Sequence, residues 1–224
     1  MKTIMLMGLE IKELSVRECL HMTGEFLKNG SLNVIYFLSG QALLSAEDSE
    51  ELRQLVKDAD IVLPDTTDIL HAAGTNNRSR EKEIERNLFL KGFFRICSRD
   101  KKRIFIIADS EEREKAIRSA VSMIQKDLNF VGTYILTDAD DAENAVNEVN
   151  SVAPDIVLSV VRTPLHEEFI YGQKMKINSK LFVAMTPAML KLREDGTINN
   201  KGFLDRLKAG FFNKAVQKYK EKEK

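Results

Sequence analysis

Short apolar segments alternate with helical segments along this chain, and this alternation limits the choice of fold. In the second half, the apolar runs Lys102–Ala108, Phe130–Leu136 and Asp155–Val161 have the length of strands. The segments between them, Ser110–Asp127 and Ala139–Val149, have the residue spacing of helices. Strands and helices that alternate over short links indicate an α/β fold with Rossmann-like layers, in which helices cover both faces of a parallel sheet.

The rest of the chain repeats the alternation. Further strands are predicted at Ile4–Met7, Leu32–Leu38, Asp60–Asp65 and Leu181–Ala184, and further helices at Ser15–Leu27, Glu47–Val56 and Glu167–Lys176. The first of these helices has a capping-box start, because Glu18 follows the N-cap candidate Ser15 at the required spacing. We therefore expect one α/β domain over residues 1–200 and a separate C-terminal segment over residues 201–224.

Composition and charge argue against several classes of protein. The chain has 224 residues, of which 43% are hydrophobic and 30% charged, as expected for a soluble globular protein with a sizeable core. A formal net charge of +0 argues against a general nucleic-acid partner. Cys19 and Cys97 are too few for a disulfide framework and fit a reducing compartment. Glu10 interrupts the apolar start of the chain before signal-peptide length is reached, so we expect a cytoplasmic protein.

A first candidate site follows the strand predicted at Asp155–Val161. Thr163, His166 and Glu167 come after its carboxyl end, where open α/β sheets form their ligand crevices. A histidine beside acidic residues can bind a metal or donate a hydrogen bond. The chain has three histidines and no spacing typical of a metal site, so the hydrogen-bonding role is favoured and no metal or cofactor is expected.

Asp65 is a second candidate, at the end of the strand predicted at Asp60–Asp65. Its carboxylate could lie in the same crevice and act as a general base on an attacking hydroxyl. Asp68 is a second choice for that role. Alternatively, Asp65, Thr66 or Thr67 could cap the helix that follows, and for an isolated Asp at this position capping is the commoner role.

Arginines that follow a turn-rich segment form a third candidate site. Arg78 and Arg86, with Arg80 between them, lie close together beyond Gly74. Guanidinium groups match the oxygens of a diphosphate. A solvated loop followed by a helix start explains the same residues, and the sequence alone favours it.

The segment Lys201–Lys224 is basic and amphipathic. It holds eight Lys or Arg residues against three Asp or Glu, and Leu204, Leu207 and Phe211 recur at helical spacing. Such a helix can lie on an anionic membrane. It can equally dock on the core with its charged end in solvent.

Four segments together resemble the WecG/TagA/CpsF family of glycosyltransferases. They are Ala59–Asp65, Val131-Gly132, Ala153–Leu158 and Thr163–Glu167, and the resemblance spans nearly the whole chain. It implies transfer of N-acetylmannosamine or a related sugar from a UDP-sugar donor to a lipid-linked diphosphate acceptor, in cell-envelope polysaccharide or teichoic acid synthesis. It also implies inversion at the anomeric carbon, no obligatory metal, and a protein peripheral to the inner membrane face.

The resemblance also implies roles for individual residues. Asp65 matches the catalytic base of the family, and His166 and Glu167 match positions that help to hold the donor. The remaining substrate-binding candidates are Thr66, Thr163, Arg78, Arg86 and Arg206. The basic C-terminal segment would contact an anionic membrane surface and the acceptor diphosphate, and the chain is compatible with a homo-oligomer.

The chain departs from the family pattern at four places. One is the end of the second strand, where Phe37–Ser39 replaces the threonine and asparagine of the family. Thr66 stands where the family has glycine, and Arg162–Glu167 stands where it has Gly-Ser-Pro-Lys-Gln-Glu. Asp109 brings a negative charge close to the expected diphosphate. A sugar-nucleotide-binding or regulatory protein with the same fold and reduced turnover is therefore the alternative. A nucleotide-dependent oxidoreductase is disfavoured, because no GxGxxG follows a predicted strand.

Overall fold

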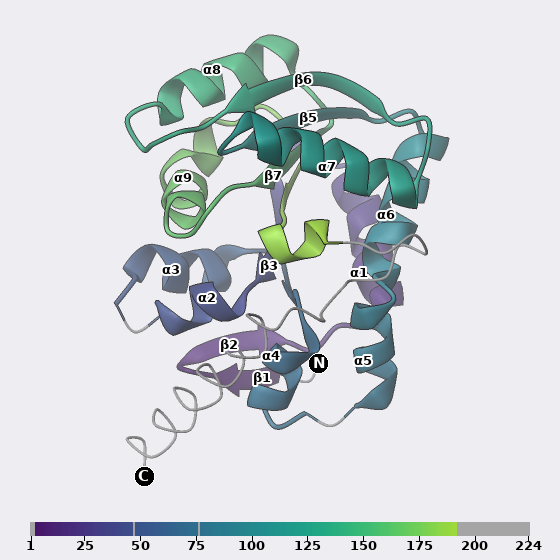
Figure 1. Ribbon diagram of the computed structural model, residues 1–224, viewed down its shortest axis with the longest axis vertical. Coiled ribbons are helices and arrows are strands. Elements are labelled where there is room, and N and C mark those ends of the chain that lie inside the picture. Colours follow the sequence, from purple (N-terminus) through teal and green to yellow (C-terminus); the bar gives the residue numbers. More distant parts are fainter. Residues whose placement is uncertain (1–2, 47, 76, 192–224) are drawn as a thin grey trace.

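The computed structural model describes residues 3–46, 48–75 and 77–191. Within them, the main sheet has six parallel strands in the order β4-β3-β8-β7-β5-β6 (Figure 1). The strands are β3 (Asn33–Leu38), β4 (Ile61–Pro64), β5 (Arg103–Ala108), β6 (Asn129–Ile135), β7 (Ile156–Val160) and β8 (Leu181–Ala184). The predicted α/β class with a parallel sheet is confirmed.

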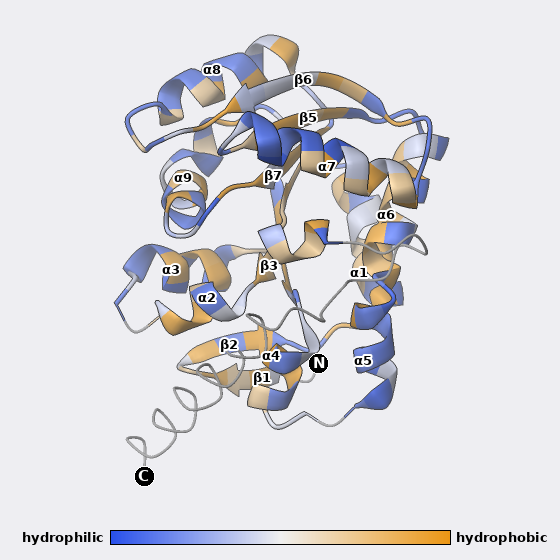
Figure 2. Cartoon of the chain, viewed as in Figure 1, coloured by the Kyte–Doolittle hydropathy of each residue, from blue (hydrophilic) through white to orange (hydrophobic). Residues whose placement is uncertain are grey.

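Helices cover both faces of the sheet, as predicted. One face carries α2 (Gly40–Leu44), α3 (Glu50–Asp58), α8 (Ala142–Val152) and α9 (Leu165–Gln173), and the other carries α1 (Val16–Phe26), α6 (Leu88–Arg99) and α7 (Glu111–Ile124). Every residue of β3, β7 and β8 is buried, because their side chains alternate between two covered faces. Figure 2 shows apolar residues along the strands and polar residues on the outer sides of the helices.

A small antiparallel hairpin lies outside the main sheet. Its strands β1 (Thr3–Leu6) and β2 (Leu9–Lys12) are joined by a turn in which Met7 and Gly8 have φ of 48° and 75°. The predicted strand at Ile4–Met7 overlaps β1. The sequence does not predict β2, because four residues of alternating polarity are too short a signal.

Capping side chains determine where several helices begin. Ser15 and Glu18 form the predicted capping box of α1. Ser49 caps α3, so this helix begins three residues later than predicted. The C-terminal ends of α7 and α9 lie three residues before their predicted positions, and the 3-10 turn η1 (Lys174–Lys176) continues α9. The helix predicted at residues 139–149 is displaced by three residues to become α8.

The helix expected after Asp65 is α4 (Thr67–Ala72). Three other short or weakly marked helices are absent from the predicted elements, namely α2, α5 (Arg78–Glu85) and α6. Asn77 caps α5 through its side chain, so the turn-rich segment after Gly74 gives way to a helix at Arg78, in agreement with the loop and helix start that the sequence favours here. Asn87 precedes α6 with φ 54° and no side-chain cap bond, which leaves that helix without a start signal. Inside α6, Gly92 lies so close to Leu20 of α1 that a Cβ would come within 2.5 Å of it.

Among the described residues, no helix is both long and apolar enough to cross a bilayer. The predicted basic segment 201–224, with Arg206, lies outside the described residues. The predicted domain boundary at residue 200 does so as well.

Candidate functional site

Neighbouring strands bring the candidate residues together at the carboxyl edge of the sheet. Asp65 directly follows β4, Thr186 follows β8, and the turn from Thr163 to Glu167 follows β7. Since β4, β3, β8 and β7 are consecutive neighbours in the sheet, segments far apart in the chain meet at this edge (Figure 1). This is the edge at which open α/β sheets bind their ligands.

The carboxyl of Asp65 is buried and half satisfied. The residue is 3% exposed, and its Oδ2 accepts a hydrogen bond from Thr186 Oγ1 at 2.9 Å. Its Oδ1 is buried and has no hydrogen-bond partner among the described residues. Burial raises the pKa of Asp65 from 3.8 to about 7, and hydrogen bonds from Thr186 and Thr66 oppose this rise. A carboxyl with such a pKa can both lose and regain a proton near neutral pH.

The structure does not support helix capping as the role of Asp65. The N-cap residue of α4 is Thr66, and no side chain makes a capping hydrogen bond to this helix. The Asp65 carboxyl instead reaches across the edge of the sheet to Thr186. The capping alternative drawn from the sequence is therefore wrong for Asp65.

Glu167 forms a second buried carboxyl on the other side of β8. Its Oε1 accepts hydrogen bonds from the Tyr36 hydroxyl at 2.6 Å and from Thr163 Oγ1 at 3.2 Å. Burial raises the pKa of Glu167, and burial together with the nearby Glu167 carboxyl raises the pKa of Tyr36 well above its usual 10. Glu167 thus ties the first turn of α9 to the middle of β3 and holds the Thr163 hydroxyl.

His166 is buried against the sheet. It is 4% exposed, and its ring centroid lies 6.5 Å from that of Phe182 in β8. Burial, with a smaller contribution from Arg113, lowers the pKa of His166 to about 3. The imidazole is therefore neutral at physiological pH and can hydrogen-bond without carrying charge. In the described ranges, no group of three or more His, Cys, Asp and Glu side chains is arranged to hold a metal ion.

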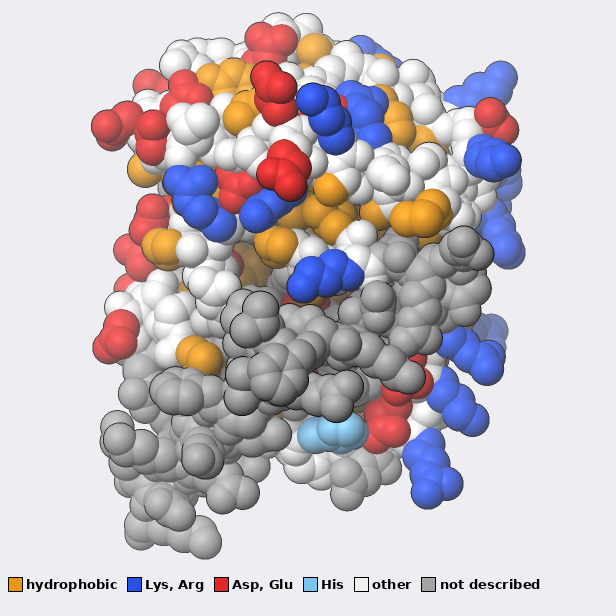
Figure 3. All heavy atoms as spheres, in the orientation of Figure 1, with side chains coloured by type: hydrophobic (Ala, Val, Ile, Leu, Met, Phe, Trp, Pro, Cys, Tyr) orange, Lys and Arg blue, Asp and Glu red, His pale blue; other side chains and the backbone are white. Residues whose placement is uncertain are grey.

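The three arginines of the α5 region have different environments. Arg78 and Arg86 are exposed at the two ends of α5, and Figure 3 shows Lys and Arg side chains along this edge of the molecule. Arg80 is 8% exposed and forms an ion pair with Glu83. Of the three arginines, Arg80 is the one that lines the same cavity as Asp65.

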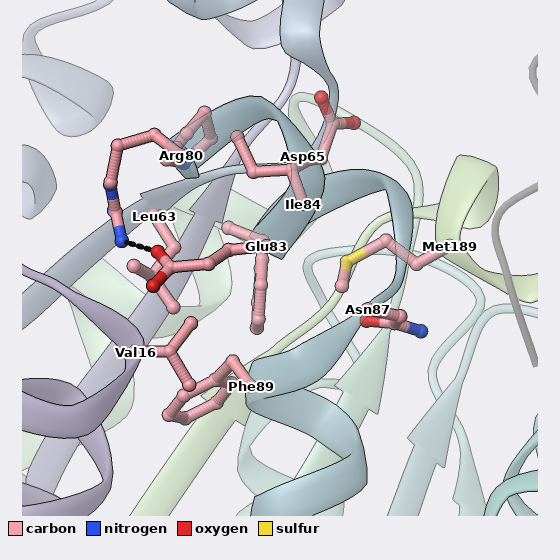
Figure 4. A pocket seen from close by; sticks show the side chains of 11 residues that line it. Val16, Leu63, Asp65, Arg80, Glu83, Ile84, Asn87, Phe89 and Met189 are labelled. Carbon is pink, nitrogen blue, oxygen red and sulfur yellow. Dashed lines mark hydrogen bonds and ion pairs between the residues drawn. The ribbon is translucent and has the colours of Figure 1, made fainter. Parts of the chain in front are cut away.

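A small cavity lies between α5 and the end of β4. Asp65, Arg80, Glu83 and Asn87 contribute to its wall, and Figure 4 shows the Asp65 carboxyl pointing away from the Arg80–Glu83 pair. The remaining wall is mainly apolar and includes Met189. The cavity measures about 30 Å³, which is room for water and far less than a sugar nucleotide requires.

Asp109, which the sequence places near the expected diphosphate, is held by arginines. Its Oδ2 accepts a hydrogen bond from Arg113 Nη1 at 2.9 Å and another from the backbone N–H of Arg162 at 2.9 Å. The carboxylate therefore ties the end of β5 to the end of β7. Its charge is balanced by Arg113, so it is not a free negative charge at this edge.

The sequence does not single out Tyr36 or Thr186. Tyr36 lies inside an apolar run that is typical of a buried strand, and its hydroxyl partner is 131 residues away. Thr186 is a lone threonine after a short strand, and Asp65 is 121 residues away. The one local signal is that Thr186 lies two residues after the end of β8 and precedes Pro187, at the edge where ligand-binding residues gather.

Comparison with protein families matches residues 4–189 to the model described as Glycosyl transferase WecG/TagA/CpsF family. No curated protein matches the chain. The matched span runs from β1 to Met189 and includes Asp65, Thr186 and the turn from Thr163 to Glu167. Every contact described above at the carboxyl edge of the sheet lies within it.

Proposed function

Because the chain belongs to the WecG/TagA/CpsF family of glycosyltransferases, we propose that it transfers a sugar from a UDP-sugar to a lipid-linked diphosphate acceptor, with Asp65 as general base. The observation that carries the proposal is the environment of Asp65. One carboxyl oxygen is held by Thr186, the other is buried without a partner among the described residues, and the pKa is about 7. General bases work best when their pKa lies near the operating pH.

The proposed reaction is a single displacement with inversion. The acceptor hydroxyl attacks the anomeric carbon of the donor, and the bond from that carbon to the UDP oxygen breaks on the opposite face. Asp65 Oδ1 takes the hydroxyl proton as the new glycosidic bond forms, and UDP leaves with the bonding electron pair. Asp65 then returns to its ionised form by releasing the proton to solvent.

The proposed donor site is the turn from Thr163 to Glu167. Glu167 is buried and already bonded to Tyr36 and Thr163, so we assign it to holding the turn in shape. The partly exposed Thr163 hydroxyl and the backbone of this turn would then face the donor. His166, neutral and buried, supports the same turn from the side of the sheet.

The proposed acceptor side includes α5 and the C-terminal segment. Arg78 and Arg86 are exposed and can meet the phosphates of the acceptor, while Arg80 lines the same cavity as Asp65. For residues 201–224, including Arg206, we propose contact with the anionic inner face of the membrane, because this segment is basic and amphipathic. N-acetylmannosamine or a related sugar remains the proposed donor sugar.

A second candidate function is sugar-nucleotide binding without turnover. The residues that favour it are Thr66 and Arg162–Glu167, which depart from the family pattern beside Asp65 and at the proposed donor site. Turnover by the intact protein separates the two functions, because both predict binding of the donor.

A thermal-shift series with UDP-sugars tests donor binding. UDP-N-acetylmannosamine and related UDP-sugars should stabilise the protein, by about 2.7 kcal/mol when the ligand is at a hundred times its Kd. Glu167→Gln should weaken this stabilisation, whereas Glu168→Gln, an exposed neighbour on the same helix, should not. No stabilisation by any UDP-sugar at millimolar concentration would sink the donor assignment.

A further inference from the structure

Thr186 makes a hydrogen bond whose geometry is fixed at both ends. The residue is 7% exposed, and its hydroxyl donates to Asp65 Oδ2. Thr186 is also the N-cap residue of η2 (Pro187–Leu190), yet its side chain makes no capping bond to that turn. The hydroxyl is thus directed at the carboxyl instead of serving its own backbone.

The sheet holds the two partners in place. The backbone N–H of Asp65 donates to Leu38 O in β3 at 3.1 Å, and that of Met185 donates to Ser159 O in β7 at 2.8 Å. β8, which leads into Thr186, is hydrogen-bonded to both β3 and β7. The distance between hydroxyl and carboxyl therefore follows from strand pairing and does not depend on a flexible loop.

The ionisable groups around Asp65 are engaged elsewhere or have the same charge. Asp68 of α4 disfavours ionisation of Asp65, and the Tyr36 hydroxyl of β3 donates to Glu167. Across the cavity, Arg80 of α5 is paired with Glu83. The charged form of Asp65 is stabilised by the hydrogen bond from Thr186 and, to a smaller extent, by Thr66.

We propose that Thr186 is a positioning residue for Asp65, which fixes one carboxyl oxygen so that the other is presented to the acceptor hydroxyl. This inference rests on the proposed function of Asp65 as the base. It assigns to a residue at the end of β8 a role that acts through Asp65 and requires no contact with either substrate. The chemical requirement is a hydroxyl at position 186, and the methyl group of the threonine is dispensable.

Substitutions at position 186 separate the effect of the hydroxyl from the effect of the side-chain volume. Thr186→Val keeps the volume and removes the donor, so the ionised form of Asp65 loses a hydrogen bond and its pKa rises. The acidic limb of the kcat/KM profile should move to higher pH, with about a tenfold loss at pH 6 and a much smaller loss at pH 9. Thr186→Ser should restore the wild-type profile. Thr186→Ala is a second donor-free variant in case valine disturbs folding.

A matched control is available in Thr23, a buried threonine of α1 whose hydroxyl donates to Cys19 O. Thr23→Val removes a buried hydroxyl that is bonded within α1 and does not affect Asp65, so it should leave the pH profile unchanged. An equal shift in the Thr23 and Thr186 variants would show a general effect on stability and overturn the positioning role.

Carbon-13 NMR of the Asp carboxyl groups in the full-length protein gives a readout that needs no turnover. The Asp65 signal, assigned by its absence in Asp65→Asn, should titrate at higher pH in Thr186→Val and at the wild-type pH in Thr186→Ser. If the wild-type enzyme is active but the titration midpoint of Asp65 is the same in Thr186→Val, the positioning role of Thr186 is overturned and the proposed function stands. A wild-type protein that transfers no sugar overturns the proposed function, and the catalytic role of Thr186 with it, whatever the titration shows.

Discussion

At Asp65, burial and catalysis make opposite demands on one carboxyl. Burial favours the neutral acid, while a general base must be ionised before it can accept a proton. The hydrogen bond from Thr186 stabilises the charged form and so opposes the effect of burial in part, and the pKa of Asp65 is about 7. The same environment therefore affects both reactivity and folding stability.

The folding cost of this carboxyl should appear as a pH dependence of stability. An unfolded aspartate ionises near pH 4, whereas folded Asp65 ionises near pH 7. Between these values the folded state keeps a proton that the unfolded state has lost, so the free energy of unfolding falls as the pH rises. The full cost, above pH 7, is about 4 kcal/mol at most.

Asp65→Asn should remove that cost. We expect this variant to be more stable than the wild type at pH 8 and to differ little at pH 4.5, as measured by urea unfolding at both pH values. Asp140→Asn, at an exposed aspartate that does not affect the Asp65 carboxyl, is the control and should change stability equally at both. A wild-type protein as stable at pH 8 as Asp65→Asn would contradict the buried, half-satisfied carboxyl.

The hydroxyl of Tyr36 should itself contribute to folding stability, apart from the packing of the buried ring. Tyr36→Phe leaves the buried Glu167 carboxyl without its closest donor, which should cost about 1–3 kcal/mol in urea unfolding. Tyr134→Phe is a matched control, because its hydroxyl donates to Asp141 at 2.8 Å in a part-buried position and should cost less. Equal costs for the two variants would argue against a special role of the Tyr36 bond.

Among the elements, long apolar runs were the most predictable. β3, β5 and β7 lie within one residue of their predicted limits, because each is a continuous apolar or β-branched run buried on both faces. Two helices differ from their predicted limits by three residues at one end. α3 begins later because Ser49 caps it, and α7 ends earlier than predicted. α6 has no cap signal and contains Gly92, whose role is close contact with α1, so only tertiary packing explains it.

The candidate site was predictable where it depends on strand ends and unpredictable where it depends on distant partners. Asp65 and the turn from Thr163 to Glu167 follow from the rule that ligands bind at the carboxyl edge of the sheet. Thr186 and Tyr36 depend on contacts over 121 and 131 residues, for which local sequence carries no signal. That Arg80 is buried while Arg78 and Arg86 are exposed depends on which side of α5 faces the core.

The exposed arginines of α5 should contribute to binding more than to stability. Arg78→Gln and Arg86→Gln change solvent-facing residues and should alter stability by less than about 0.5 kcal/mol. If they meet the acceptor phosphates, each should raise the KM for the acceptor several-fold with kcat unchanged, most clearly at low salt. Steady-state kinetics with varied acceptor measure this. Lys82→Gln, exposed on the same helix between them, tests whether any loss of charge has the same effect.

An unchanged KM in both arginine variants would remove α5 from the acceptor site. A fall in kcat without a change in KM would instead place the arginines in the chemical step, contrary to the proposal.

At the scale of the whole molecule, the charge of the chain is unevenly distributed. The formal net charge is +0, yet residues 201–224 hold eight Lys or Arg against three Asp or Glu. The sheet and the apolar layers on both its faces are formed by residues 3–191. A membrane-contacting role for the basic segment can therefore be tested by deletion.

Removal of residues 201–224 should abolish binding to anionic vesicles and leave a protein that unfolds cooperatively. The basic segment supplies the electrostatic attraction, so binding by the full chain should weaken as salt is raised and be lost on neutral vesicles. Vesicle sedimentation with thermal unfolding as the folding control measures both. Undiminished binding after deletion, or none by the full chain, would reject this membrane contact.

The most direct test of the whole account is sugar transfer by the full-length protein and by Asp65→Asn. The assay needs a UDP-sugar that stabilises the wild type and a lipid-linked diphosphate acceptor. Loss of a general base should lower kcat by about a hundred- to ten-thousand-fold, while stabilisation by the UDP-sugar persists in the variant. Near-normal turnover by Asp65→Asn would contradict the assignment of Asp65 as the base.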